Sequence, residues 1–119
     1  MKKTVVIGAS ENPERYSNKA IRSLLQHQHA VVAIGNKVGA VAGVSIHKEL
    51  LPELEVDTVT LYINPKIQVD YEAYILSLKP KRVIFNPGTE NPAFEVKLKA
   101  NDIQPLEACT LVLLATGQY

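Results

Sequence analysis

The sequence predicts an α/β domain in which helices cover both faces of a mostly parallel, five-stranded sheet. One observation behind this is a series of short apolar segments rich in β-branched residues, a composition typical of strands buried on both faces. A second is that segments with apolar residues at helical spacing lie between most of these strands. Strands that alternate with helices favour parallel pairing through right-handed crossovers. We therefore expect a three-layer, Rossmann-like fold.

In the first half of the chain, hydrophobic spacing separates one helix from the strands around it. Ala20, Ile21 and Leu24 fall on one face of a helix. The small residues of segment 38–44 favour a loop rather than a regular element. The elements expected here are a strand at 4–7, a helix at about 16–28 and a strand at 30–34, and segment 44–46 is either a short edge strand in addition to the five or part of the loop.

In the second half, proline marks the limits of the elements. Asn64 and Asn91 each stand as an N-cap residue before a proline at the first helical position. Pro105 restricts its strand to an edge of the sheet, because proline has no N–H to donate. The elements expected here are strands at 57–63, 81–85 and 103–106, a helix from 65 that ends before Pro80, a helix from 92, and a terminal helix within 109–115 that covers either the sheet or a partner subunit.

The composition narrows the classes of function. A chain of 119 residues, 46% hydrophobic and 21% charged, fits one globular domain over residues 1–119. A net charge of +1 and few aromatic residues give no reason to expect a nucleic acid or an acidic membrane as partner. The single cysteine fits the reducing cytoplasm. The apolar stretch near the N-terminus is too short for a signal peptide and no run reaches membrane-spanning length, so we expect a cytoplasmic protein.

The segment from Thr4 to Ser17 is the first candidate for a binding site. A buried strand leads through the small residues Gly8-Ala9-Ser10 and a polar turn into a helix. The N–H groups and the dipole at a helix N-terminus favour an anion at such a turn, and the Arg15 guanidinium is placed to bind phosphate in a bidentate manner. The glycine fingerprint of dinucleotide-binding folds is absent. The alternative is an ordinary turn with a solvated arginine.

A ligand of such a sheet binds beyond the carboxyl ends of the strands, where the strand order reverses. The residues expected there are small, amidic and slightly basic: Gly8, Ala9, Ser10, Asn12, Gly35, Asn36, Lys37, Asn64, Asn86 and Gly88. They include no carboxylate pair, no grouped metal ligands and no nucleophile with a positioned base. The sequence therefore predicts no catalytic residue and no metal site, and it favours a binding protein over an enzyme.

Lys37 bears on the kind of nucleotide. Sites for NAD usually place an acidic residue after the second strand, where it accepts hydrogen bonds from the ribose. This chain has Lys37 and no carboxylate there, which suits a ribose that carries a phosphate, as in NADP and coenzyme A (CoA). A solvated surface lysine is the alternative.

Four segments of the chain resemble a known family, the small stand-alone CoA-binding proteins. That family is related in fold to the CoA-binding domain of the succinyl-CoA synthetase alpha subunit. The segments are 6–17, 34–37 with Gly43 following, 57–62 and 86–91, in the order expected of the family. Members commonly have Asn-Pro-Lys after the second strand, where this chain has Gly35-Asn36-Lys37.

The resemblance implies a ligand and places it. CoA would lie across the carboxyl edge of the sheet, its diphosphate facing the backbone N–H groups of Gly8, Ala9 and Ser10. The resemblance further implies that Arg15 and Ser17 add contacts to the diphosphate, that Lys37 approaches the adenosine 3′-phosphate, and that Tyr62 and Asn64 flank the adenine or the pantetheine arm. The function expected is a non-enzymatic CoA or acyl-CoA binding module, with regulation as one role. An NADP-binding module or an accessory subunit of an oxidoreductase is the alternative.

Two further hypotheses concern the C-terminal region. Cys109 either forms a mixed disulfide with the CoA thiol or is a small buried apolar residue. The apolar segment 111–114 predicts a homodimer if the domain does not cover it alone.

Overall fold

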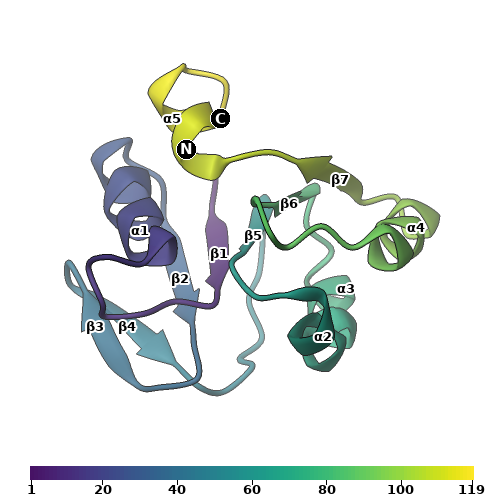
Figure 1. The fold of residues 1–119 in the computed structure, drawn as a ribbon, viewed down its shortest axis with the longest axis horizontal. Coiled ribbons are helices and arrows are strands. Elements are labelled where there is room, and N and C mark those ends of the chain that lie inside the picture. The colour runs from purple at the N-terminus through teal and green to yellow at the C-terminus, as the bar shows by residue number, and fades with distance from the viewer.

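Seven strands form a single sheet in the computed structural model, which describes residues 1–119 (Figure 1). The order of the strands is β3-β4-β2-β1-β5-β6-β7, and every neighbouring pair is parallel except β3 with β4. The strands are β1 (Thr4–Ile7), β2 (Val31–Ile34), β3 (Gly39–Val41), β4 (Val44–His47), β5 (Thr58–Leu61), β6 (Arg82–Phe85) and β7 (Gln104–Glu107).

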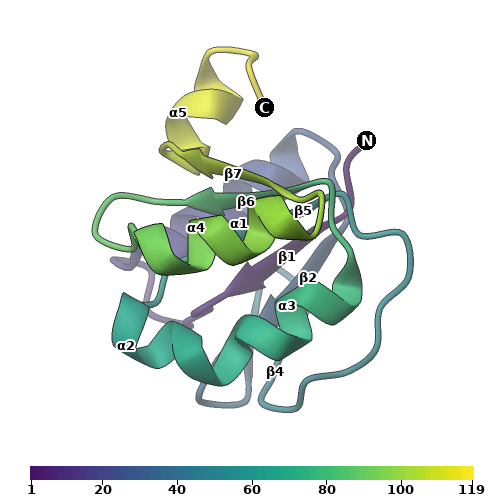
Figure 2. The ribbon, with the colours of Figure 1, turned by 90° about the vertical axis from the view of Figure 1, so that its right-hand side faces the viewer.

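Helices cover both faces of the sheet, so the three-layer α/β architecture expected from the sequence is confirmed. Figure 2 shows α2, α3 and α4 in front of the sheet and α1 behind it. The helical segments are α1 (Tyr16–Gln26), α2 (Pro65–Gln68), the 3₁₀ turn η1 (Val69–Tyr71), α3 (Glu72–Leu78), α4 (Pro92–Ala100) and α5 (Thr110–Ala115). None of these helices has the length and hydrophobicity needed to cross a lipid bilayer.

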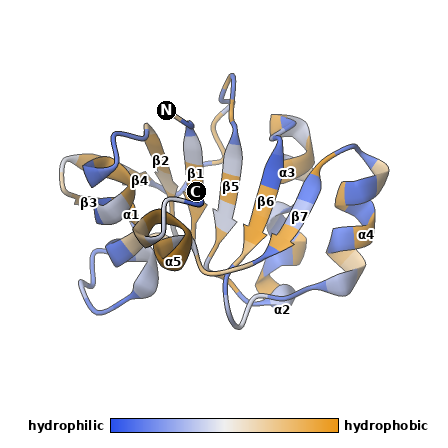
Figure 3. Ribbon diagram, turned by 90° about the horizontal axis from the view of Figure 1, so that it is seen from above, coloured by the Kyte–Doolittle hydropathy of each residue, from blue (hydrophilic) through white to orange (hydrophobic).

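Two apolar cores lie on opposite faces of the sheet because successive strand residues point to opposite sides. Val5 and Ile7 pack in one core, which also contains Phe85 and the apolar residues of α3 and α4. Val6 packs in the other, with Ile21 of α1 and the apolar side of α5. In Figure 3, α5 and the carboxyl-terminal part of β6 are among the hydrophobic segments. The short terminal helix therefore covers the sheet, which was one of the two expected positions for it.

The prediction of five strands is wrong, because segment 38–44 is not a loop. It contains β3 and the start of β4, which form a hairpin around Ala42 and Gly43. Both turn residues have positive φ, 49° and 84°, as the favoured two-residue hairpin turn requires. Val41 and Ile46 are each 1% exposed, so the hairpin buries one face of its side chains. The strand expected at 44–46 is therefore an inner strand, and β3 forms the edge.

Several expected boundaries differ from the structure. The helix expected at about 16–28 ends at Gln26, and the helix expected from 65 is divided into α2, η1 and α3. The strands expected at 30–34 and 57–63 are shorter, at 31–34 and 58–61. The strand that contains Pro105 does lie at an edge of the sheet, as β7.

Candidate functional site

The strand order reverses at β1, which lies between β2 and β5. The chain leaves β1 for α1 on one face of the sheet, and it leaves β5 for α2 on the other, so the two connections diverge at this point (Figure 2). Two glycines let the strand ends approach closely below the opening. A Cβ on Gly8, whose φ is +96°, would lie 2.9 Å from the Tyr62 carbonyl oxygen, and one on Gly35 would lie 2.4 Å from that of Ala9.

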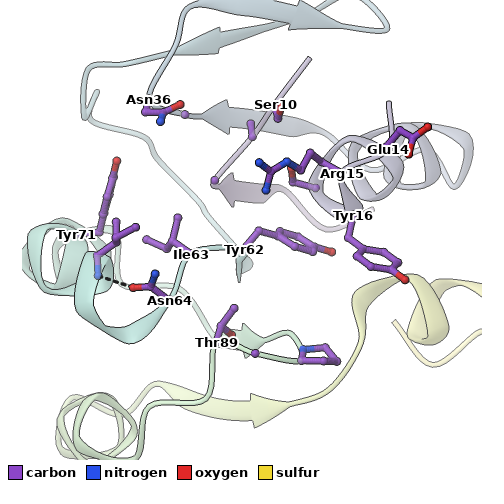
Figure 4. Close-up of a pocket in the computed structure, with 17 residues that line it drawn as sticks. Ser10, Glu14, Arg15, Tyr16, Asn36, Tyr62, Ile63, Asn64, Tyr71 and Thr89 are labelled. Atoms are coloured by element: carbon purple, nitrogen blue, oxygen red, sulfur yellow. Dashed lines mark hydrogen bonds between the residues drawn. The ribbon is translucent and has the colours of Figure 1, made fainter. Parts of the chain in front are cut away.

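An open cleft of about 550 Å³ lies at this carboxyl edge, between the start of α1 and the loops that follow β5 and β6 (Figure 4). Its lining comprises Gly8, Ala9, Ser10, Glu14, Arg15, Tyr16, Ser17, Gly35, Asn36, Tyr62, Ile63, Asn64, Ile67, Tyr71, Pro87, Gly88 and Thr89. A smaller hollow of about 260 Å³ shares Ala9, Ser10 and Asn36 with the cleft, and we call it the adenosine-side hollow because the sequence resemblance implies that Lys37 approaches an adenosine 3′-phosphate. It is completed by Glu11, Asn12, Lys37 and Val38.

The N-terminus of α1 leaves N–H groups free at the cleft. Arg15, the N-cap residue, makes no side-chain cap hydrogen bond. The backbone N–H groups of Tyr16 and Ser17 have no partner within the protein, and neither does that of Ser10. These three residues line the cleft, so their N–H groups and the helix dipole favour an anion there.

Gly8 and Ala9 do not supply the N–H donors expected of them. Both of their N–H groups donate to the Ile34 carbonyl oxygen, each at 2.9 Å. The end of β1 thus continues its pairing with β2 for two residues beyond the strand. The free N–H groups belong instead to Ser10, the next residue, and to Tyr16 and Ser17 at the start of α1. Tyr16 was not among the residues predicted for the site.

A short relay of hydrogen bonds fixes the loop between β1 and α1. Asn18, buried on the first turns of α1, donates from Nδ2 to the Ser10 carbonyl oxygen at 2.9 Å and accepts from Arg22 Nε at 2.9 Å. Asn12 accepts from the Glu14 N–H at 3.0 Å, and the Ser10 hydroxyl accepts from the Asn12 N–H at 3.1 Å. Asn18 and Ser17 are polar residues next to the apolar positions Ala20, Ile21 and Leu24 of the same helix, and this is the sequence signal that could have identified Asn18.

Two basic side chains at the edge of the sheet have no acidic partner. The ion pairs of the structure join Lys3 to Glu53, Lys81 to Asp57 and Lys97 to Glu72, and they involve neither Arg15 nor Lys37. In Figure 4 the Arg15 guanidinium extends over the cleft toward the side of Ser10, whereas Glu14 points away from it. The positive charge near the free amides is therefore available to an anionic ligand.

The opposite wall of the cleft is apolar and amidic. Burial raises the pKa of Tyr62 to about 12, so its phenol stays neutral at physiological pH. Asn64 acts as the N-cap of α2, since its Oδ1 accepts from the Ile67 N–H at 3.0 Å (Figure 4). That bond leaves the Asn64 Nδ2 group without a partner in the protein.

Asn86 has a structural role and lines neither the cleft nor the adenosine-side hollow. It is 3% exposed, and Nδ2 donates to Thr60 Oγ1 at 2.6 Å and to the Leu61 carbonyl oxygen at 2.9 Å. Its Oδ1 accepts from the Thr110 N–H at 2.9 Å. Because both halves of the amide are used, Asn86 joins β5, β6 and α5 and is not available to a ligand, contrary to expectation.

A second buried amide network supports the same wall. Gln68 of α2 donates from Nε2 to the carbonyl oxygens of Ile63, at 2.9 Å, and Thr89, at 2.7 Å. Asn91 donates to Gln68 Oε1 at 2.9 Å and caps α4 by accepting from the Phe94 N–H at 3.2 Å. The N-cap role of Asn91 is as predicted. The role of Gln68 was not predicted, because nothing in the sequence of the helix that begins at Pro65 indicates that this polar side chain is buried.

The structure brings most of the expected site residues together. Those that line the cleft are Gly8, Ala9, Ser10, Arg15, Ser17, Asn36, Tyr62, Asn64 and Gly88. Asn12 and Lys37 line the adenosine-side hollow, whereas Asn86 lines neither. Cys109 is half-buried at the N-cap of α5 and is not among the lining residues either. The lining residues that the sequence did not single out are Glu14, Tyr16, Ile63, Ile67, Tyr71 and Thr89, of which Tyr16 and Ile67 belong to the first turns of helices.

Residues 2–115 match the protein family described as the CoA binding domain. The chain belongs to this family. A crystal structure of an uncharacterized protein is similar to this CoA-binding domain over 100% of the chain and 98% of its own length, with 50% identity and a TM-score of 0.98. No curated protein sequence is significantly similar to it.

More distant solved structures share the fold of this CoA-binding domain. The protein cell-free ID.343 from Thermus thermophilus is 22% identical, with a TM-score of 0.84 over 99% of this chain and 91% of that one. A dinucleotide-forming acetyl-coenzyme A synthetase 1 from Ca. Korarchaeum cryptofilum, in complex with phosphate and ADP, is 15% identical, with a TM-score of 0.69. The match covers 88% of this chain and 25% of the synthetase.

Proposed function

We propose that this domain binds CoA or an acyl-CoA without catalysing a reaction of its own, and that the diphosphate lies at the N-terminus of α1. The observation that carries the proposal is the set of unpaired N–H groups of Ser10, Tyr16 and Ser17 at an open cleft, with the unpaired Arg15 guanidinium beside them. Main-chain donors and a guanidinium are the groups that bind a diphosphate most effectively. Membership of the CoA-binding family supports the identity of the ligand.

The two hollows suggest how the ligand is oriented. The adenosine 3′-phosphate would approach Lys37 in the adenosine-side hollow, which joins the cleft through Ala9, Ser10 and Asn36. Tyr62 and the unpaired Nδ2 group of Asn64 would then flank the adenine or the pantetheine arm within the cleft. We include Asn12, Ser17, Asn36 and Gly88 among the contacts because they line the same two spaces.

The non-enzymatic part of the proposal follows from the chemistry of the cleft lining. Its ionisable residues other than tyrosine are Glu14 and Arg15, and it contains neither histidine nor cysteine. The Ser10 hydroxyl accepts a hydrogen bond from the Asn12 N–H, and no carboxylate or imidazole is hydrogen-bonded to it as a general base would be. Such a site can hold and orient a nucleotide but offers no pair of groups for nucleophilic or acid–base catalysis. Regulation of a partner enzyme in response to bound CoA is a role that fits this chemistry.

Isothermal titration calorimetry with CoA, acetyl-CoA and NADPH tests the proposal. We expect CoA and acetyl-CoA to bind more tightly than NADPH, because the proposed site holds the diphosphate and the extended pantetheine arm of CoA in the same cleft. Tighter binding of NADPH would favour the alternative of an NADP-binding module. The absence of heat with CoA at millimolar concentration would exclude the proposal. A cytoplasmic location and a homodimer stay predictions of the sequence, and sedimentation of the protein over a range of concentrations tests the second.

A further inference from the structure

Glu11 links two loops that are far apart in the sequence. Its Oε2 accepts a hydrogen bond from the Ala40 N–H at 2.9 Å. Glu11 belongs to the loop between β1 and α1, and Ala40 belongs to β3, the edge strand of the sheet. Between them lies segment 36–38, which contributes Lys37 to the adenosine-side hollow. The hydrogen bond therefore ties Glu11, which lines this hollow, to the strand that directly follows the lining segment 36–38.

Gly39 leaves the space that the Glu11 side chain occupies. A Cβ at position 39 would lie 2.4 Å from Glu11 Cδ, and its three nearest neighbours would all be atoms of Glu11. Gly39 has no left-handed backbone conformation that would itself demand glycine. The absence of a side chain, rather than the backbone conformation, is what this contact requires.

The charge of Glu11 is unfavourable for a phosphate in the same hollow, so another property must explain its place there. Glu11 forms no ion pair with Lys37 or any other cation of the chain. Its carboxylate is used as an acceptor for one N–H on the free edge of β3. A carboxylate in this position serves to hold the two loops in register.

We propose that Glu11 is a positioning residue that makes the site prefer a ligand whose ribose carries a phosphate monoester. It holds segment 36–38 beside the loop that follows β1, and so places the Lys37 ammonium at the ribose phosphate. This inference rests on the proposed function, and it names the residue pair Glu11 and Gly39 on which the preference depends.

Calorimetry with CoA and with dephospho-CoA, which lacks the 3′-phosphate, tests the inference. We expect Glu11→Ala to weaken CoA binding about fivefold, the net contribution of one typical hydrogen bond, and to change dephospho-CoA binding by less than about twofold. Glu11→Gln keeps an acceptor for the Ala40 N–H and removes the negative charge, so it should bind CoA at least as tightly as the wild type. Glu49→Ala removes an equally exposed carboxylate outside both hollows and serves as the matched control.

A double-mutant cycle tests whether Gly39 acts through Glu11. Gly39→Ala should displace the Glu11 carboxylate and weaken CoA binding to the same degree as Glu11→Ala. In the Glu11→Ala background it should have no further effect, because the group that it displaces is gone. Additive effects of the two substitutions would overturn the inference.

Hydrogen exchange reports on the link without any ligand. The Ala40 N–H should exchange faster in Glu11→Ala than in the wild type and in Glu11→Gln. If Glu11→Ala weakens CoA and dephospho-CoA equally, or if Glu11→Gln fails to restore CoA binding, the inference is wrong although the proposed function stands. A wild-type protein that binds neither ligand would overturn both.

Discussion

The two walls of the cleft differ in whether their polar groups form hydrogen bonds within the protein. The wall formed by residues 8–17, which we call the open wall, keeps four backbone N–H groups, those of Ser10, Glu11, Tyr16 and Ser17, and the Arg15 guanidinium without partners. The wall formed by residues 62–64 and 87–89, which we call the closed wall, is supported from behind by buried amides whose hydrogen bonds are satisfied inside the protein. No buried polar side-chain atom anywhere in the chain lacks a partner.

Because of this difference, we expect one wall to determine the affinity for a ligand and the other to determine the stability of the fold. Unpaired donors at a solvent-filled cleft cost little while water binds them, and they gain when a phosphate replaces the water. Buried amides contribute in the folded protein itself, where leaving one partner unpaired is expensive. Substitutions in the open wall should therefore change ligand binding, and substitutions behind the closed wall should change folding.

The largest effect is expected for Asn86 behind the closed wall. Asn86→Ala leaves Thr60 Oγ1, the Leu61 carbonyl oxygen and the Thr110 N–H without their present partner. We expect a loss of about 2–4 kcal/mol in the free energy of unfolding, measured by urea denaturation. Asn36→Ala, at an exposed amide of the cleft, is the control and should change the free energy of unfolding by less than about 0.5 kcal/mol. Equal losses in the two variants would contradict the comparison.

The next effect is expected for Arg15 in the open wall. Arg15→Ala should weaken CoA binding by about 1–3 kcal/mol, because it removes a charge-assisted contact to phosphate. Arg15 is exposed and makes no ion pair, so the unfolding curve should stay where it is. Calorimetry at two salt concentrations should also show a smaller salt dependence in the variant. Unchanged binding would place the diphosphate elsewhere.

A smaller effect is expected for Asn64, which belongs to both categories. Asn64→Ala removes the N-cap of α2 and should lower the free energy of unfolding by about 1 kcal/mol. Asn64→Asp keeps the cap but replaces the free Nδ2 donor with negative charge. If Asn64 contacts the ligand, the aspartate variant should retain stability and lose affinity for CoA. A variant that retains both would assign Asn64 to capping alone.

The smallest effect is expected for His29, which is remote from both walls. It concerns a pH dependence of the stability that does not involve the cleft. Burial is the main cause of the lowered pKa of His29, and the positive charges of the amino terminus, His27, Lys2 and Arg82 add to it. Its Nδ1 accepts from the Lys2 N–H at 2.9 Å, and its ring lies 4.9 Å from that of Tyr119.

The sign of the pH effect follows from that lowered pKa. Because the unfolded chain takes up the proton more readily, stability should be full above pH about 6.5 and should fall as the pH is lowered below it. Thermal unfolding from pH 8 to pH 5 measures this, and His29→Gln should flatten the profile. If the stability of that variant falls with pH as steeply as that of the wild type, other titratable groups cause the pH dependence.

Much of the fold, and part of the composition of the cleft lining, follow from local sequence patterns. The alternation of strands and helices, the caps at Asn64 and Asn91, and the edge position of Pro105 each depend on neighbouring residues, so the sequence alone determined them. The loop from Gly8 to Ser17 was predicted in the same way as an anion site, which stays a prediction, and the structure shows that this loop lines the cleft and leaves N–H groups free.

Tertiary structure decided the features that depend on partners distant in the sequence. The hairpin of β3 and β4 depends on burial against β2 and α1, which the small residues of segment 38–44 do not reveal. The Ile34 carbonyl oxygen decides that Gly8 and Ala9 have no free N–H, and Thr60 and Thr110 decide that Asn86 is structural. A hydrogen bond uses a donor only when the fold brings an acceptor to it, and so the sequence could indicate which groups are candidates for binding an anion but not which of them stay free.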